Sequence, residues 1–302
     1  MIKIIIFSFD RALQLEALLA SVRKYWSKTE YNLSVIYNTS HERFEQGYQI
    51  LKNQYSEYNF IKETENRHAY SWQTYFSLFN VKKLLRYPHT RRQKTNFREL
   101  VIKETNFVSC EYVMFLTDDS VFIKEVLLSN EDLSFIDEKP FQNQLSLRLG
   151  KNITEKPADI PCRRGKIEWD FHLYRQARSW GYNFSVDAHI YSKKLITGLV
   201  RKIIFNNPTT LEGHLNNYVQ IHNLANHGRT FEEPFILSFP INMVQNIAHN
   251  ESLHISTEQL NKMFVEGKRL EYIVPAEILE FQQYPEEVML RKGKTKEYLK
   301  LK

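Results

Sequence analysis

Two adjacent carboxylates, Asp118 and Asp119, directly follow the strongest apolar segment of the chain, YVMFLT at 112–117. That segment predicts a buried strand, and ligands of open α/β sheets bind beyond the carboxyl ends of strands. Two neighbouring acids repel each other, and a divalent cation relieves the repulsion. Carboxylate oxygens are the ligands that Mg²⁺ and Mn²⁺ prefer. The pair therefore predicts a metal that offsets charge on a diphosphate. The alternative is a turn or helix cap made by either aspartate.

The elements that must position this pair alternate between strand and helix. The apolar run at 3–7 predicts a buried strand, and apolar residues at 15, 18, 19 and 22 form one face of a helix that Asp10 would cap. Further strands are expected at 33–37 and 58–62, and helices at 44–55, 70–85 and 97–105. This order predicts an α/β fold with a mixed, mostly parallel sheet flanked by helices. Beyond residue 122, strands are expected at 144–149 and 184–192, and helices from Pro208 and at about 257–266.

The charge of the chain is concentrated in two segments. The net charge is +6, and residues 80–103 carry eight Lys or Arg against one acid, while the C-terminal LRKGKTKEYLKLK is also basic. Such segments favour anionic partners or form solvated faces. No apolar run approaches the roughly 20 residues of a membrane helix, and the apolar N-terminus is too short for a signal peptide. We therefore expect a cytoplasmic protein, with a peripheral contact of the basic C-terminus at the inner face of a membrane.

Three segments resemble family-2-like glycosyltransferases of the GT-A type. KIIIFSFDRALQLEALLASV resembles their opening strand and helix, VMFLTDDSVF resembles their DxD motif, and NNPTTLEGHLNN resembles their acceptor-side helix. The segments occur in the family's order and span roughly residues 1–250. The resemblance implies a GT-A fold, a UDP- or GDP-sugar donor, Mn²⁺ or Mg²⁺, and a glycan or lipid-linked acceptor. Ser120 stands where a strict motif has its second aspartate, which puts the number of protein–metal bonds in doubt.

The resemblance also implies roles for single residues. Asp119 would bind the metal directly, and Asp118 would face the ribose or reach the metal through water. The donor nucleotide would lie beside Ser8, Asp10 and Arg11. Arg11 could instead contact only the helix that it starts.

Further candidates complete the expected site. Lys103, in the basic segment, is assigned to the donor. His249 is the best-placed late histidine for the metal or diphosphate. Trp180 and His189 are assigned to the acceptor, although a large aromatic such as Trp180 also suits a core.

Two carboxylates compete for the role of base. An inverting transferase needs one carboxylate to take the proton of the acceptor hydroxyl. Glu212 is the first candidate, but with Thr209 it also fits a capping box that would merely start a helix. Asp187 is the competitor, and in a strand it would share a face with His189.

Other functions fit the sequence less well. A sugar-phosphate nucleotidyltransferase would be expected to have a glycine-rich loop after the first strand, where this chain reads FSFDRALQ. A nucleic-acid-binding module could use residues 80–103, but no recognised motif is present, and we expect no nucleic-acid partner. The histidines lack the spacing of a metal-dependent hydrolase. We expect a catalytic domain at 1–255, with a nucleotide-binding half at about 1–122 and an acceptor half at about 123–255. A helical, basic extension would follow at 256–302.

Overall fold

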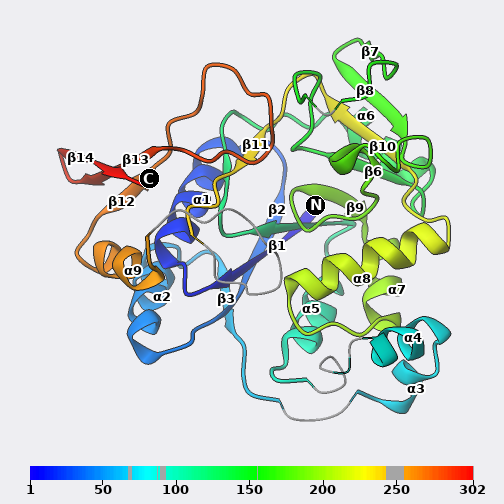
Figure 1. The fold of residues 1–302 in the computed structure, drawn as a ribbon, viewed down its shortest axis with the longest axis horizontal. Coiled ribbons are helices and arrows are strands. Elements are labelled where there is room, and N and C mark those ends of the chain that lie inside the picture. The colour runs from blue at the N-terminus through cyan, green and yellow to red at the C-terminus, as the bar shows by residue number, and fades with distance from the viewer. Residues whose placement is uncertain (67–69, 87, 89–92, 155, 243–254, 302) are drawn as a thin grey trace.

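The computed structural model describes residues 1–302 except 67–69, 87, 89–92, 155, 243–254 and 302. A nine-stranded mixed sheet crosses the molecule in the order β3-β2-β1-β4-β9-β6-β10-β8-β7, with helices on both faces (Figure 1). This confirms the α/β class predicted from the alternation of strands and helices. The strands are β1 (Ile2–Phe9), β2 (Tyr31–Asn38), β3 (Asn59–Lys62), β4 (Tyr112–Thr117), β6 (Asn143–Ser146), β7 (Cys162–Arg163), β8 (Lys166–Asp170), β9 (His189–Ser192) and β10 (His227–Phe231).

The first half of the chain forms the parallel part of the sheet. Strands β3, β2, β1 and β4 are neighbours and all run in the same direction. Alternate residues of β1 point to opposite faces, as the pleat of a strand requires. Ile4 and Ile6 pack with helices α1 (Ala12–Tyr25), α2 (Glu42–Gln54) and α9 (Thr257–Val265). Ile5 and Phe7 pack with α5 (Phe97–Thr105), α7 (Lys193–Lys202) and α8 (Pro208–Ile221).

The second half brings further segments to the same edge of the sheet. Strand β9 runs antiparallel to β4 and to β6. The residues before β9 and those after β6 therefore lie at the edge where the parallel strands β1 and β4 end. Four segments of the chain thus converge on one edge. Strands β11 (Ile236–Ser238) and β5 (Ser120–Phe122) form a short antiparallel pair beside it.

Three expected elements differ from the structure. The strand expected at 144–149 is β6, which ends at Ser146. The single helix expected at 70–85 is broken into α3 (Trp72–Tyr75) and α4 (Leu78–Arg86). The strand expected at 184–192 begins only at His189, because Ala188 has a φ of 56°, which an extended strand does not allow. Asp187 therefore precedes the strand and does not share a face of it with His189. The other helices in the described part of the chain are α6 (Asn130–Glu138) and the short 3-10 helix η2 (Arg178–Gly181).

The C-terminal segment is not helical throughout. Helix α9 is followed by a three-stranded antiparallel sheet of β12 (Arg269–Glu271), β13 (Glu287–Lys292) and β14 (Thr295–Lys300). Buried Val288 and Leu290 alternate with more exposed residues, which is the period of a strand, and Gly293 at φ 58° forms the turn. The expectation of a helical extension was wrong for this reason. None of the described helices is long and apolar enough to cross a membrane.

Candidate active site at the carboxyl edge of the sheet

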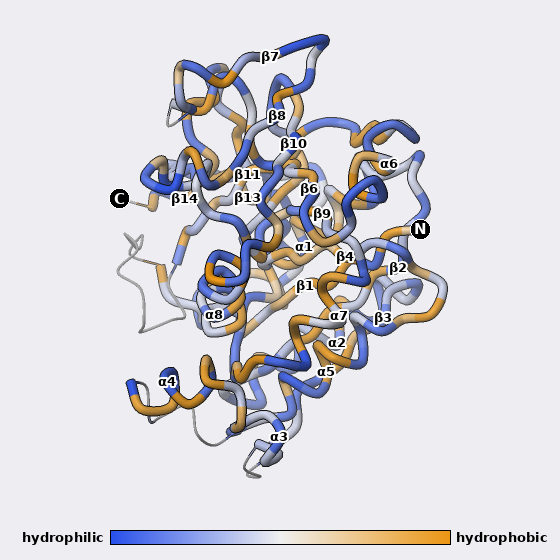
Figure 2. The backbone as a smooth tube through the Cα atoms, turned by 90° about the vertical axis from the view of Figure 1, so that its right-hand side faces the viewer, coloured by the Kyte–Doolittle hydropathy of each residue, from blue (hydrophilic) through white to orange (hydrophobic). Residues whose placement is uncertain are grey.

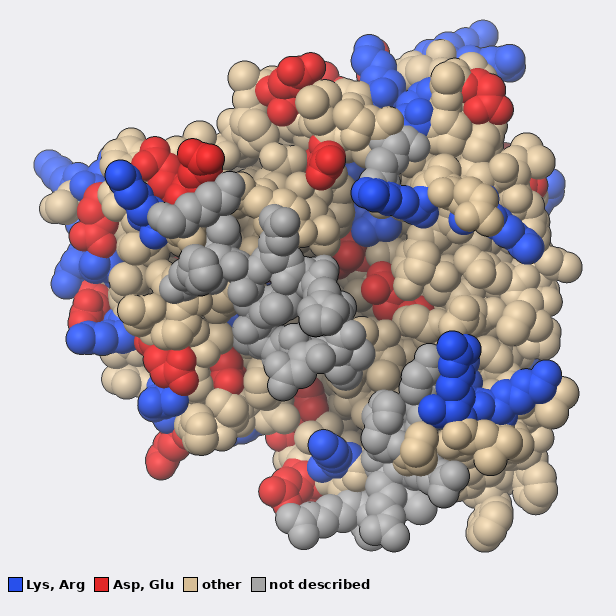
Figure 3. Space-filling model, viewed as in Figure 1, with Lys and Arg blue, Asp and Glu red and all other residues tan. Residues whose placement is uncertain are grey.

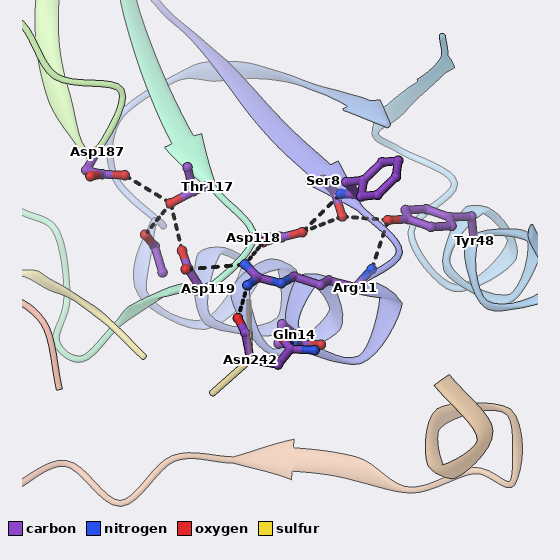
Figure 4. A network of polar contacts seen from close by, with 11 residues as sticks. Ser8, Arg11, Gln14, Tyr48, Thr117, Asp118, Asp119, Asp187 and Asn242 are labelled. Atoms are coloured by element: carbon purple, nitrogen blue, oxygen red, sulfur yellow. Dashed lines mark hydrogen bonds and ion pairs between the residues drawn. The ribbon is translucent and has the colours of Figure 1, made fainter. Parts of the chain in front are cut away.

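Asp118 is held by donors from the turn after β1. Ser8 donates from its hydroxyl to Asp118 Oδ2 over 2.8 Å, and the backbone N–H of Phe9 lies 3.3 Å from the same oxygen. Arg11 Nη1 lies 3.1 Å from Asp118 Oδ1 and 3.4 Å from Asp119 Oδ2 (Figure 4). Both oxygens of Asp118 thus have protein partners. The side chain of Asp119 is 16% exposed, against 5% for Asp118.

Arg11 is the cation that the two aspartates share within the protein. Burial raises the pKa of Asp118, and the charge of Asp119 raises it further, while Arg11 opposes both effects. The guanidinium is itself buried and also donates to the backbone oxygen of Asn242. Arg11 stands at the start of α1 but makes no side-chain cap of it. The structure therefore brings Arg11 to the aspartates, as part of the site rather than as a helix cap.

Asp187 lies on the other side of Asp119. The hydroxyl of Thr117 is 2.8 Å from Asp119 Oδ1 and 2.9 Å from Asp187 Oδ1 (Figure 4). One hydroxyl proton cannot serve both carboxylates at once, so the pair of contacts suits a proton on one of them. Burial raises the pKa of Asp187 to about 7, and the negative charge of Glu212 contributes next. Arg148 Nη1, 3.4 Å from Asp187 Oδ2, opposes this rise.

Glu212 faces the loop that carries Asp187. Its Oε1 accepts hydrogen bonds from the hydroxyl of Ser185 at 2.8 Å and from the N–H of Val186 at 3.0 Å. The capping box of α8 is made by Asn207 and Thr210, so Glu212 has no part in it. The capping alternative for Glu212 is therefore wrong, because the helix starts two residues earlier than the Thr209 pattern required. Glu212 instead holds Ser185 and Val186, the two residues that precede Asp187 in the chain.

Four residues of this site were not singled out from the sequence. Arg148 follows β6 and is buried, and its Nε has no partner among the described residues. A charged residue inside the apolar run QLSLRL was the available signal. Thr117 ends β4, and Tyr48 donates to or accepts from Ser8 at 2.7 Å. The phenol of Tyr272, just after β12, is buried near the aspartates. Burial raises the pKa of this phenol, and the negative charges of the two aspartates raise it further. No local pattern marks Tyr272, because it reaches the site only through tertiary packing.

Asp10 lies at the carboxyl end of β1, beside Arg11, whereas Lys103 lies away from the aspartates. The side chain of Asp10 accepts from the N–H and hydroxyl of Ser40 and caps no helix. Lys103 is exposed in the last turn of α5, beside Glu104, which pairs with Lys3 near the start of β1. It therefore lies at the opposite edge of the sheet from the aspartates. His249 lies outside the described residues.

The two proposed acceptor contacts are buried. Trp180 has no exposed surface, and its ring packs edge-on against Trp169 at 4.9 Å. His189 is also fully buried, and its Nδ1 lies 2.7 Å from Gln144 Oε1. Burial lowers the pKa of His189 well below its ordinary range, which keeps the ring neutral. Trp180 therefore belongs to a core, and His189 to the interior of the sheet. Neither is placed to touch an acceptor.

The site opens into a hollow of the surface. Figure 3 shows acidic side chains within a depression near the middle of this face, over the region of β9, with basic side chains at its rim. The described His, Cys, Asp and Glu residues form no group of three with the spacing of a metal site. Asp119 nevertheless keeps acceptor capacity, because its partners are one hydroxyl and a 3.4 Å contact to Arg11. A single carboxylate with phosphate oxygens and water is a common way for proteins to bind Mg²⁺.

Comparison with known proteins places the chain beside glycosyltransferases. No model of a known protein family matches the sequence. The sequence is 27% identical over an alignment of 253 residues, which covers 76% of this chain, to the bifunctional glycosyltransferase pgtA of Dictyostelium discoideum. The chain is similar to a glycosyltransferase. This similarity confirms the resemblance that the three sequence motifs indicated, although the chain covers only 27% of the length of that protein.

Solved structures give a weaker likeness. The structure of S. aureus TarS is 16% identical over 78% of this chain and 36% of that chain, with a TM-score of 0.46. The complex of S. aureus TarS 1–349 with UDP covers 78% of this chain and 59% of that chain at the same identity, with a TM-score of 0.43. Both TM-scores are below 0.5.

Proposed function

We propose that this protein is a glycosyltransferase that moves a sugar from a nucleoside-diphosphate donor to a hydroxyl of a glycan or lipid-linked acceptor. The observation that carries the proposal is the row of groups at the carboxyl edge of the sheet. Asp119 and Asp187 share the hydroxyl of Thr117, and Arg11 and Arg148 flank them. The sequence similarity to a glycosyltransferase supports the same reaction class.

The groups divide between the donor and the acceptor. Ser8 and Arg11, with Asp118 fixed between them, would line the nucleotide side at the end of β1. Asp119 would hold Mn²⁺ or Mg²⁺. When bound, the cation would offset negative charge on the departing diphosphate. Arg148 adds a buried positive charge on the acceptor side.

Asp187 is the proposed general base. In the reaction, the acceptor oxygen bonds to the anomeric carbon, and the bond from that carbon to the diphosphate breaks with its electron pair. The proton of the acceptor hydroxyl passes to the carboxylate of Asp187. A pKa raised to about 7 suits this role, because a base works best when its pKa lies near the working pH. Glu212 then acts as a positioning residue, which holds Ser185 and Val186 and raises the pKa of Asp187. Transfer by this route would invert the anomeric centre.

The reaction class is tested with a panel of nucleotide sugars and Mn²⁺, recording free nucleoside diphosphate by luminescence. We expect slow metal-dependent hydrolysis of one donor, and its loss in Asp119→Ala but not in the control Asp159→Asn, at an exposed surface carboxylate. No diphosphate from any donor would refute the proposal. Release of pyrophosphate from a nucleoside triphosphate and a sugar phosphate would identify a nucleotidyltransferase instead.

The base is tested by pH–rate profiles of the same hydrolysis or of transfer once an acceptor is known. Asp187→Asn should abolish turnover and leave nucleotide affinity intact. Glu212→Gln should remain active, with its acidic limb moved to lower pH, because the charge that raises the pKa of Asp187 is removed. A complete loss in Glu212→Gln, with activity retained in Asp187→Asn, would assign the base to Glu212.

A further inference from the structure

An apolar ridge projects from the molecule at helices α3 and α4. Trp72, Phe76, Leu78, Val81 and Leu85 are 79%, 81%, 68%, 41% and 72% exposed. Trp72 and Phe76 are one helical turn apart, and the other three have the spacing of one face of α4. Figure 2 shows α4 standing away from the body of the chain with hydrophobic stretches along it. Single exposed apolar residues are common, but a run of this kind marks an interaction surface. These five residues are called the apolar ridge.

The ridge is fixed to the body by the opposite side of the same helices. Asn80 is fully buried, and its amide donates to the backbone oxygens of Lys202 at 2.8 Å and Thr74 at 2.5 Å. The ring of Phe79 packs edge-on against Tyr218 at 5.4 Å. Helix α4 therefore has a satisfied inner face, and the ridge faces outward as a consequence of this anchoring.

A basic pocket adjoins α3, beside Trp72 and Phe76 of the ridge. Its volume is about 510 Å³, and its lining combines polar residues of the α3 region with three cations and two apolar or aromatic residues, namely Ser71, Gln73, Thr74, Ser77, Arg98, Arg201, Lys202, Ile102 and Tyr218. The lining includes no Asp or Glu among the described residues. Arg98 donates to the backbone oxygens of Arg201 and Ile203 and so holds the end of α7 in place. Arg201 and Lys202 are exposed at that end of the helix. The pocket thus suits a ligand with negative charge.

We propose that the apolar ridge and the basic pocket form a binding site for the surface of an anionic phospholipid bilayer. The ridge would enter the boundary between headgroups and acyl chains, and the pocket and the exposed Lys82 would bind headgroup phosphates. Charge complementarity selects this partner, since the pocket cations and Lys82 accompany the exposed apolar residues, and an anionic bilayer offers apolar chains and negative charge together. Lys82 and Arg98, two members of the basic segment at 80–103, thereby gain a function that the active site does not give them.

The position of the ridge suits a membrane-bound acceptor. Figure 3 shows basic side chains over α4 on the same face as the acidic hollow of the candidate active site. A bilayer that contacts the ridge would therefore lie on the side from which an acceptor enters. This last step depends on the proposed function, whereas bilayer binding itself does not.

Co-sedimentation with vesicles tests the proposal on the full chain. The vesicles contain about 30 mol% phosphatidylglycerol in phosphatidylcholine, with pure phosphatidylcholine for comparison. We expect binding to the anionic vesicles that weakens with salt. The double variant Trp72→Ser/Leu85→Ser should reduce binding about tenfold or more. Arg201→Gln/Lys202→Gln should reduce binding to the anionic vesicles and its salt dependence together.

Matched controls separate this site from other surfaces. Leu173→Ser changes an apolar residue that is 75% exposed outside α3 and α4. Lys294→Gln/Lys296→Gln removes two exposed charges from the β13–β14 hairpin and tests the contact expected of the basic C-terminus. Both controls should bind as the unmodified chain does. Unchanged binding by the ridge variant, or no binding by the unmodified chain, would refute the site. So would self-association that the ridge variant abolishes without vesicle binding.

Bilayer binding and donor hydrolysis are measured separately, so either proposal can be refuted without the other. Donor hydrolysis is measured without vesicles, and the ridge variants should keep both that activity and their melting temperature. A chain that binds vesicles but hydrolyses no donor would refute only the enzyme assignment.

Discussion

Replacement of Asp187 by Asn should stabilise the protein, and more so at high pH. A buried carboxyl whose pKa is raised from its ordinary 3.8 to about 7 binds more protons in the folded state than in the unfolded state between these values. The unfolding free energy of the unmodified protein therefore falls as pH rises through this window. Asn carries no charge and is free of this penalty.

The size of the effect follows from the two pKa values. With 3.8 in the unfolded chain and about 7 in the folded one, the penalty is about 2 kcal/mol at pH 5 and about 4 kcal/mol at pH 8. These are upper limits, because Asn also leaves Arg148 without its carboxylate partner. We expect the advantage of the variant to grow by up to about 2 to 3 kcal/mol between pH 5 and pH 8.

Urea denaturation at several pH values measures this difference directly. Asp159→Asn controls for the substitution itself at an exposed position. The same Asp187→Asn protein should have lost donor turnover, so stability and activity should move in opposite directions. A variant that is destabilised equally at pH 5 and pH 8 would show that the pKa of Asp187 is not raised in the folded protein. That result would also refute the argument that makes Asp187 the base.

Three further substitutions test the placement of single residues. Arg11→Gln should destabilise the fold by about 3 to 5 kcal/mol, because it leaves two neighbouring carboxylates without their buried cation; a change below 1 kcal/mol in urea denaturation would contradict this. Asn207→Ala should cost about 1 kcal/mol through the lost cap of α8, and an unaltered melting curve would argue against that cap. Trp180→Ala should lower the free energy of unfolding by about 3 to 5 kcal/mol, because it truncates a core side chain. Unchanged stability with a raised KM for the acceptor would instead assign Trp180 to the acceptor site.

Much of the nucleotide-binding half could be predicted from the sequence. The strand at 112–117 and the helix at 97–105 were predicted with the bounds that the structure has, because apolar runs and helical stripes are local signals. The position of the acidic pair at the end of this strand was predicted for the same reason. The resemblance also implied different roles for the two aspartates, with Asp119 as the direct metal ligand. In the structure, Asp119 has the more exposed side chain of the two. The metal itself stays a prediction.

The acceptor half was harder to predict because its contacts join distant segments. Asp187 reaches the site because β9 runs antiparallel to β4, and neither strand order nor direction is written in a local pattern. The same applies to Arg148 and to Tyr272, which are separated from Asp119 along the chain. Trp180 was assigned to an acceptor because composition cannot tell an exposed aromatic from a buried one.

The sequence by itself determined that two carboxylates end a buried strand of an α/β sheet, since hydrophobic pattern and strand length are properties of a few neighbouring residues. The tertiary structure decided what surrounds them. It brings Arg11 into contact with both aspartates and Asp187 within hydrogen-bond distance of the hydroxyl of Thr117. It also puts Lys103 at the edge of the sheet opposite the aspartates. Burial and charge act over a few ångströms in space, whatever the separation along the chain, so the pKa values and partners of these groups became readable only in the folded molecule.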